Sequence, residues 1–188
     1  MILLKSLKLT IFELKEHAIK YSKELHKHVQ INVTCDDYKL PEPTLLDIKT
    51  ILLQLLNNAC DHAIESSLER SVAQKPNDST ITIVVVKKEG GYLFEIKDDG
   101  RGIDADHVVQ KAVRLGLVPA NDLSSLKHQW ERVLFLPGFT TLDRPTTYSG
   151  RGVGLDIVKN LVEKNGGTIQ VSSQKNKGST FSFWISVK

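Results

Sequence analysis

The sequence predicts an α+β fold, a two-layer α/β sandwich in which a mixed β-sheet carries helices on one face. Two kinds of periodicity support this. Several segments alternate apolar and polar residues, as half-buried strands do, and others repeat apolar residues at three- and four-residue steps, as amphipathic helices do. The third observation is their order along the chain: helix, strand, helix, hairpin, lid, helix, hairpin, with no internal repeat.

The N-terminal half contains two helical patterns and one strand. Residues 7–25 have apolar side chains at helical spacing, which predicts a helix lying on a core. Residues 29–34 alternate and predict a half-buried strand. A longer helical pattern runs from about residue 44 to 70 and is followed by the polar stretch 74–79. We therefore expect one long helix in the middle of the chain.

The C-terminal half contains two hairpins and two more helices. Gly90-Gly91 joins the arms of the first hairpin, and Gly166-Gly167 ends the last helix before the second hairpin begins. The predicted strands are 80–86, 92–97, 168–173 and 180–187, and the predicted helices are 104–116 and about 152–164.

Residues 117–150 form the one long irregular stretch, with three prolines among isolated apolar residues. Connections longer than about 15 residues are uncommon in compact domains unless they have a function, and an active-site lid is a frequent one. We expect a lid at about 117–150 within a single domain that spans residues 1–188.

Composition excludes several classes of protein. The 25 Lys and Arg residues against 22 Asp and Glu residues give a formal charge of +3, with no basic block of the kind that binds nucleic acid. Cys35 and Cys60 have neither zinc-ligand nor disulfide-framework spacing. No apolar run reaches the ~18 residues of a membrane span. We expect a cytoplasmic domain without membrane contact.

A polar seam runs along the long predicted helix between two apolar stripes, if residues are placed at about 100° per step. One stripe contains Leu45, Ile48, Leu52, Leu55 and Ala59, and the other Leu46, Leu53, Cys60 and Ile64. The seam contains Asp47, Thr50, Gln54, Asn58, Asp61 and Glu65, with His62 at its edge. Either the seam faces solvent through a gap in the packing, or it lines a ligand site in which the Asn58 amide oxygen binds Mg²⁺.

The segment 96–103 places an acidic pair and two glycines directly after a predicted strand. Gly100 and Gly102 can take positive φ and allow close approach to a flat ligand. Asp98 can accept a hydrogen bond from an adenine amino group. The alternative is an ordinary tight turn.

The segment 149–156 places Gly150, Gly152 and Gly154 at the start of a predicted helix, where backbone N–H groups can hold phosphate. The spacing fits neither a dinucleotide fingerprint nor a Walker A loop, because Leu155 and Asp156 occupy the decisive positions. Taken alone, this cluster could equally be a hinge.

In this order, the three segments resemble the ATP-binding (Bergerat-type) fold shared by histidine kinases, DNA gyrase, Hsp90 and MutL. Within that fold, the chain from about residue 21 to 188 most resembles the catalytic domain of CheA-type chemotaxis histidine kinases. The segments that carry the resemblance are 58–65, 69–70, 98–103, 111–117, 135–141, 149–154 and 178–181. The run 135–141 and the Asp61-His62 pair are particular to the chemotaxis branch.

The resemblance implies a role for each segment. Asn58 and Gln54 would be the catalytic residues and would hold Mg²⁺. Asp98 would read the adenine amino group. Phe135 and Phe139 would anchor the lid, although each ring could equally be a core aromatic. The positions assigned to ATP binding are Asn58, Asp61, His62, Asp98, Gly100, Gly102, Ile103, Gly150, Arg151, Gly152, Val153, Gly154, Leu155 and Ser179.

Three positions depart from the family pattern. Gln54 replaces a His of the chemotaxis branch and cannot act as a base, which argues against a hydrolytic ATPase of the Hsp90 type. Asn57 replaces a usual Arg. Ser179 replaces a Thr but keeps the hydroxyl group.

No histidine of the chain lies in a phosphoacceptor pattern, so the acceptor would be on another domain or protein. The resemblance therefore implies the ATP- and Mg²⁺-dependent catalytic domain of a two-component, chemotaxis-like histidine kinase. Its partners would be a phosphoacceptor His domain, a downstream response regulator and the other domains of a longer kinase chain. A stand-alone Ser kinase of the same fold and a catalytically silent nucleotide-binding module are the alternatives.

Overall fold

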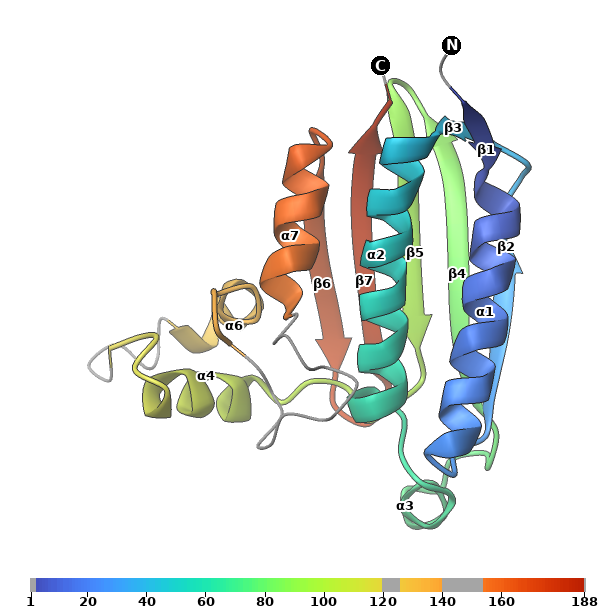
Figure 1. Cartoon of the computed structure of the whole chain (residues 1–188). Helices are drawn as coiled ribbons and strands as arrows, with labels where there is room; N and C mark the ends of the chain where they lie inside the picture. Colours follow the sequence, from blue (N-terminus) through green and yellow to red (C-terminus); the bar gives the residue numbers. More distant parts are fainter. Residues whose placement is uncertain (1–2, 120–125, 140–153, 188) are drawn as a thin grey trace.

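The computed structural model describes residues 3–119, 126–139 and 154–187, and its main body is a five-stranded sheet with three helices on one face (Figure 1). The strands lie in the order β2-β4-β5-β7-β6. They are β2 (Val29–Thr34), β4 (Ser79–Lys88), β5 (Gly91–Asp98), β6 (Thr168–Gln174) and β7 (Gly178–Ser186). The helices on the sheet are α1 (Leu7–Glu24), α2 (Glu42–Asn58) and α7 (Leu155–Lys164). The predicted fold class is confirmed.

The sheet is mixed because β2 pairs with β4 in parallel, whereas the other neighbours pair antiparallel. Alternation along β4 and β5 turns one set of side chains toward the helices. Phe94 of β5 faces Phe183 of β7 across the pair, and their rings stack at a centroid distance of 4.6 Å. Both rings are fully buried, so the middle of the sheet and the three helices form one apolar core.

A two-stranded ribbon of β1 (Leu4–Ser6) and β3 (Lys39–Pro41) lies beside this layer. The sequence analysis did not predict it, because three residues are too few for a periodic pattern. Ser6 also begins α1: its hydroxyl accepts a hydrogen bond from the Leu9 N–H.

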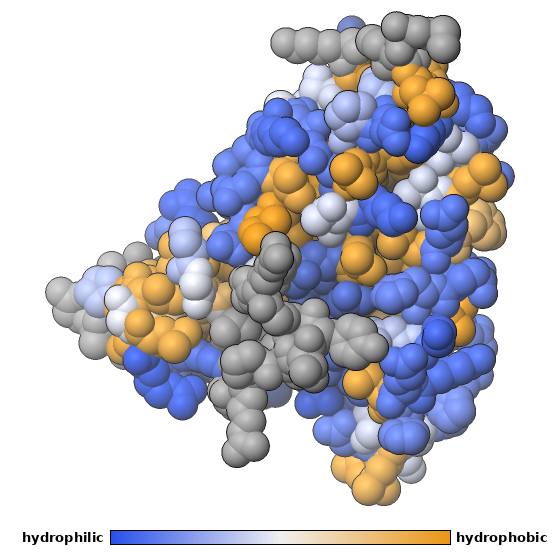
Figure 2. All heavy atoms as spheres, viewed as in Figure 1, coloured by the Kyte–Doolittle hydropathy of each residue, from blue (hydrophilic) through white to orange (hydrophobic). Residues whose placement is uncertain are grey.

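A second apolar cluster joins α4 (Ala105–Arg114) and α6 (Trp130–Val133) to the edge strand β6. In Figure 2, hydrophobic side chains gather where these helices lie. Phe135 and Phe139 belong to this cluster and are 9% and 5% exposed. Within the described part of the predicted lid, these two rings are therefore core aromatics. The rest of that prediction falls on residues 120–125 and 140–150, outside the described ranges.

The prediction of one continuous helix from 44 to 70 is wrong. After α2 the chain makes one wider turn, the π-helix η1 (Ala59–Ala63), becomes extended at Ile64, and starts α3 (Ser67–Val72). A capping box begins α3: the Ser66 side chain accepts from the Glu69 N–H while Glu69 accepts from the Ser66 N–H. The Ser-x-x-Glu capping signal lies within the apolar pattern that predicted one helix. The hydrogen bonds of the capping box start a new helix there despite that pattern.

Two smaller predictions are also refined. The last helix begins at Leu155 with Gly154 as its N-cap, and residues 152 and 153 lie outside the described part. Leu46, placed on the second apolar stripe, is 62% exposed, whereas Cys60 and Ile64 are fully buried. Among the described residues, no helix is long and apolar enough to cross a membrane.

Candidate functional site

Asp98 ends strand β5 and is 5% exposed. Its Oδ1 accepts hydrogen bonds from the backbone N–H groups of Gly100, at 2.9 Å, and Ser179, at 3.3 Å. Burial raises the pKa of this carboxyl to about 6, against the effect of these two bonds. A buried carboxylate held by backbone donors at a strand end is a rigid acceptor for a ligand that offers an N–H group.

Gly100 and Gly102 allow the chain to turn tightly under other backbone segments. A Cβ on Gly100 would lie 2.2 Å from the Ala63 carbonyl oxygen. Gly102 has φ +71°, and a Cβ there would lie 2.3 Å from the Gln174 carbonyl oxygen. The close approach that these glycines allow is therefore to the protein's own backbone, which places the turn between the end of η1 and the β6–β7 connection.

Ile103 and Ser179 meet through Ser173, a residue that the sequence analysis missed. The Ile103 N–H donates to Ser173 Oγ at 2.8 Å, and the Ser173 and Ser179 hydroxyl oxygens are 3.1 Å apart. Ser179 is 4% exposed. The second hairpin therefore supports the Asp98 turn from one side, and only the pairing of β7 with β5 could have revealed it.

Gln54 and Asn58 lie one helical turn apart near the end of α2, where Gln54 Nε2 donates to Asn58 Oδ1 at 3.2 Å. No group of three or more His, Cys, Asp or Glu side chains that could hold a metal occurs in the described ranges. Mg²⁺ is commonly held by one or two protein oxygens together with substrate phosphates, so this pair of amides fits that ion. In the same turn, Asn57 Oδ1 is buried without a hydrogen-bond partner among the described atoms.

The π-helix η1 contains Asp61 and His62. Side chains from α1 and from the turn that follows α1 form hydrogen bonds to it. The Tyr21 hydroxyl donates to Asp61 Oδ1 at 2.6 Å, and Lys27 Nζ donates to the carbonyls of Cys60, at 2.6 Å, and Asp61, at 3.0 Å. Burial lowers the pKa of His62, because the charged imidazolium is poorly solvated there. Single π-turns inside helices are frequent at functional sites.

The predicted polar seam does not continue along one helix. Asp47 accepts hydrogen bonds from Lys164 and Asn165 of the α7 C-terminus, and Thr50 bonds back to the Leu46 carbonyl. Glu65 turns away after η1 into a buried ion pair. The structure therefore brings Gln54, Asn58, Asp61 and His62 together and separates the other seam residues from them.

Gly154 and Leu155 lie at the start of α7. A Cβ on Gly154 would lie 2.8 Å from Asp156 Oδ1 and 3.2 Å from the Phe139 carbonyl oxygen. Leu155 packs against both apolar clusters. The other residues predicted to hold the phosphates, Gly150, Arg151, Gly152 and Val153, lie outside the described part of the chain.

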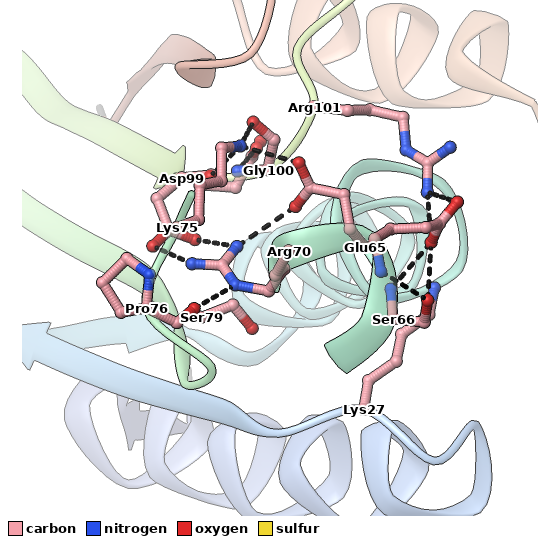
Figure 3. Close-up of polar contacts among 12 residues, drawn as sticks. Lys27, Glu65, Ser66, Arg70, Lys75, Pro76, Ser79, Asp99, Gly100 and Arg101 are labelled. Atoms are coloured by element: carbon pink, nitrogen blue, oxygen red, sulfur yellow. Dashed lines mark hydrogen bonds and ion pairs between the residues drawn. The ribbon is translucent and has the colours of Figure 1, made fainter. Parts of the chain in front are cut away.

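An ion cluster under the Asp98 turn, with Glu65 and Arg70 buried and Asp99 partly exposed, was also missed (Figure 3). We call Glu65, Arg70, Lys75 and Asp99 the Arg70 cluster. Arg70 is 1% exposed and contacts Glu65 at 3.1 Å and Asp99 at 3.0 Å, while Lys75 contacts Glu65 at 2.7 Å. Glu65, Arg70 and Lys75 lie within one stretch around α3, and Asp99 joins them from the end of β5, a contact that the sequence alone does not indicate.

The fold and a family model place the chain in a class of ATPases. The family model described as histidine kinase-, DNA gyrase B- and HSP90-like ATPase matches residues 44–188, and the chain belongs to that family. Two solved structures have the same fold. The catalytic domain of the histidine kinase ThkA aligns with a TM-score of 0.62 at 19% identity, over 99% of this chain and 95% of that one. The mycobacterial sensor histidine kinase MprB aligns with a TM-score of 0.61 at 15% identity, over 99% of this chain and 97% of that one.

Within the family, the chain is similar to the chemotaxis protein CheA. It is 32% identical to CheA of Bacillus subtilis over 164 residues and 34% identical to CheA of Halobacterium salinarum over 167 residues. These alignments cover 87% and 88% of the chain but only 24% and 25% of the relatives. The predicted resemblance is confirmed, and the chain spans about a quarter of the length of these relatives.

Proposed function

We propose that this chain is the ATP-binding catalytic domain of a chemotaxis-type histidine kinase in a two-component system. The observation that carries the proposal is Asp98, a buried carboxylate whose Oδ1 is held by two backbone N–H groups. We assign Oδ2 to the adenine amino group. The similarity to CheA over most of the chain supports the same function.

In the proposed reaction, an imidazole nitrogen of the acceptor attacks the γ-phosphorus of ATP. An N–P bond forms, the bridging P–O bond to the β-phosphate breaks, ADP leaves, and the other imidazole nitrogen releases its proton to water. Bound Mg²⁺ would neutralise charge on the phosphates. Asn58 and Gln54 are the residues that would hold the ion, and Asp98 would hold the adenine ring. This domain would therefore contribute positioning rather than a covalent intermediate.

The proposal also includes partners for this domain. They are an acceptor histidine, a response regulator and the remaining domains of a longer cytoplasmic kinase. Its support is that the chain spans about a quarter of the curated CheA relatives.

One observation favours a second candidate, a catalytically silent nucleotide-binding module. Gln54 has no basic nitrogen, and its amide N–H already donates to Asn58 Oδ1. If the missing base is required, the domain would bind ATP without transferring phosphate.

Two measurements test the proposal. Calorimetric titration with ATP and ADP, with and without Mg²⁺, should give binding in the micromolar range. Incubation with γ-labelled ATP and the isolated phosphoacceptor domain of a CheA relative should then label the acceptor on histidine, as acid-labile phosphate. Absence of adenine-nucleotide binding contradicts both candidates, whereas binding without labelling favours the silent module.

A further inference from the structure

The Arg70 cluster lies directly against the turn that carries Asp98 (Figure 3). The Arg70 guanidinium donates to both carboxylate oxygens of Asp99, at 3.3 and 3.0 Å, and to Glu65 at 3.1 Å. It also donates to the backbone carbonyls of Pro76, at 2.6 Å, and Asp78, at 3.4 Å. One buried side chain thus joins the segment after η1, the α3–β4 connection and the end of β5.

Lys75 holds the same turn by its backbone. Its Nζ donates to Glu65 Oε1 at 2.7 Å, to the Asp99 carbonyl at 2.9 Å and to the Gly100 carbonyl at 2.7 Å. The Gly100 N–H is one of the two donors to Asp98 Oδ1. A displacement of the Lys75 ammonium would therefore move the donor that orients the Asp98 carboxylate.

The charges of the cluster also act on Asp98. Asp99 and Glu65 are the two titratable groups whose negative charge raises the pKa of Asp98. Both are paired with cations in the cluster, because Arg70 contacts each of them and Lys75 contacts Glu65. The two cations and two carboxylates cancel formally, so the anions beside Asp98 are neutralised at close range.

We propose that Arg70 and Lys75 are positioning residues for the adenine-reading carboxylate. Lys75 holds the Asp99 and Gly100 carbonyls of the turn, and Arg70 holds the Asp99 carboxylate. Together the two cations neutralise the carboxylates beside Asp98, which keeps Asp98 an ionised acceptor at neutral pH. The inference rests on the proposed function for its ligand, but the effect on Asp98 itself exists without nucleotide.

The first test is an NMR titration of the Asp98 carboxyl carbon in the nucleotide-free chain. Arg70→Gln and Lys75→Gln each remove a cation and should raise the Asp98 pKa from about 6 by about one pH unit. Asp99→Asn removes a neighbouring anion and should lower it. Lys97→Gln is the matched control, because it also removes one positive charge, from the residue next to Asp98 in sequence. The Lys97 side chain is exposed and points to the opposite face of β5 from Asp98, so no shift of the Asp98 pKa is expected.

The second test is the affinity for ADP at about pH 6 and about pH 8. A one-unit rise in the Asp98 pKa should weaken ADP binding about fivefold at the lower pH and leave it nearly unchanged at the higher pH. The ADP affinity of the variant is divided by that of the parent at the same pH, because this ratio removes the effect of the titration of ADP itself. A merely structural loss would weaken binding at both pH values.

Shifts of the Asp98 pKa in opposite directions in Lys75→Gln and Asp99→Asn support the inference. Substitution of Lys75 is less disruptive to folding than substitution of Arg70, because the Lys75 side chain is 13% exposed. Unchanged Asp98 titration in Lys75→Gln, or equal loss of ADP affinity at both pH values, overturns it even if Arg70→Gln does not fold. If the parent chain binds no ADP, the proposed function fails, whereas the NMR titration still decides the inference.

Discussion

Asp98 accepts a hydrogen bond from the backbone N–H of Ser179, 81 positions further along the chain. The contact exists because β7 lies beside β5 in the sheet and the turn before β7 ends next to the last residue of β5. It places the proposed adenine acceptor at the end of β5, in the sheet itself.

Asp98→Asn should reduce the affinity for ATP and ADP by at least about tenfold. An amide presents an N–H group as well as an oxygen and carries no charge, so it is a poorer acceptor for an amino group. Calorimetric titration measures the change. Asp104→Asn, at the exposed N-cap of α4, is the control and should bind normally; equal affinities in the two variants would contradict the adenine assignment.

Asn58→Ala should remove the Mg²⁺ dependence of ATP binding more than the binding itself. The variant deletes the amide oxygen proposed to hold the ion and leaves the Asp98 turn intact. Titrations with ATP in Mg²⁺ and in EDTA measure the difference. The metal assignment is wrong if the variant retains the parent's Mg²⁺ dependence.

Relative to Asp98→Asn, the parent chain should lose stability as pH rises from about 4 to 6. The pKa of Asp98 is about 6 in the folded chain and near 3.9 when unfolded, so the folded state binds the extra proton between these values. The loss should be about 2 to 3 kcal/mol and should be absent in Asp98→Asn. Urea unfolding across this pH range measures it; the same slope in both proteins would place the titrating group elsewhere.

Gly102→Ala should destabilise the chain more than Gly116→Ala. Both glycines have positive φ, +71° and +69°, so both substitutions carry a backbone cost of about 1 kcal/mol. A Cβ at Gly102 would also lie 2.3 Å from the Gln174 carbonyl oxygen, whereas nothing lies within 4 Å of a Cβ at Gly116. Urea unfolding compares the pair, and equal losses would mean that the Gly102 turn can shift away from Gln174 freely.

Much of the fold and part of the site could be predicted from the sequence. Alternation over six to ten residues and helical spacing over longer runs are local properties, and they identified the five strands of the sheet and the three helices packed on it. The acid before Gly100 and Gly102 predicted the proposed adenine-binding turn for the same reason, because its chemistry lies within six consecutive residues, although those residues alone left an ordinary tight turn as the alternative.

Tertiary structure decided the rest. Apolar periodicity continued through residues 59–70, but it does not distinguish one helix from a π-turn, an extended link and a capped new helix, since each buries the same side chains. Most supports of Asp98 come from residues distant in sequence: Ser173, Ser179, and Glu65, Arg70 and Lys75 of the Arg70 cluster. Buried charges are stable only when opposite charges and hydrogen-bond donors surround them, and that arrangement forms only once the whole sheet has assembled.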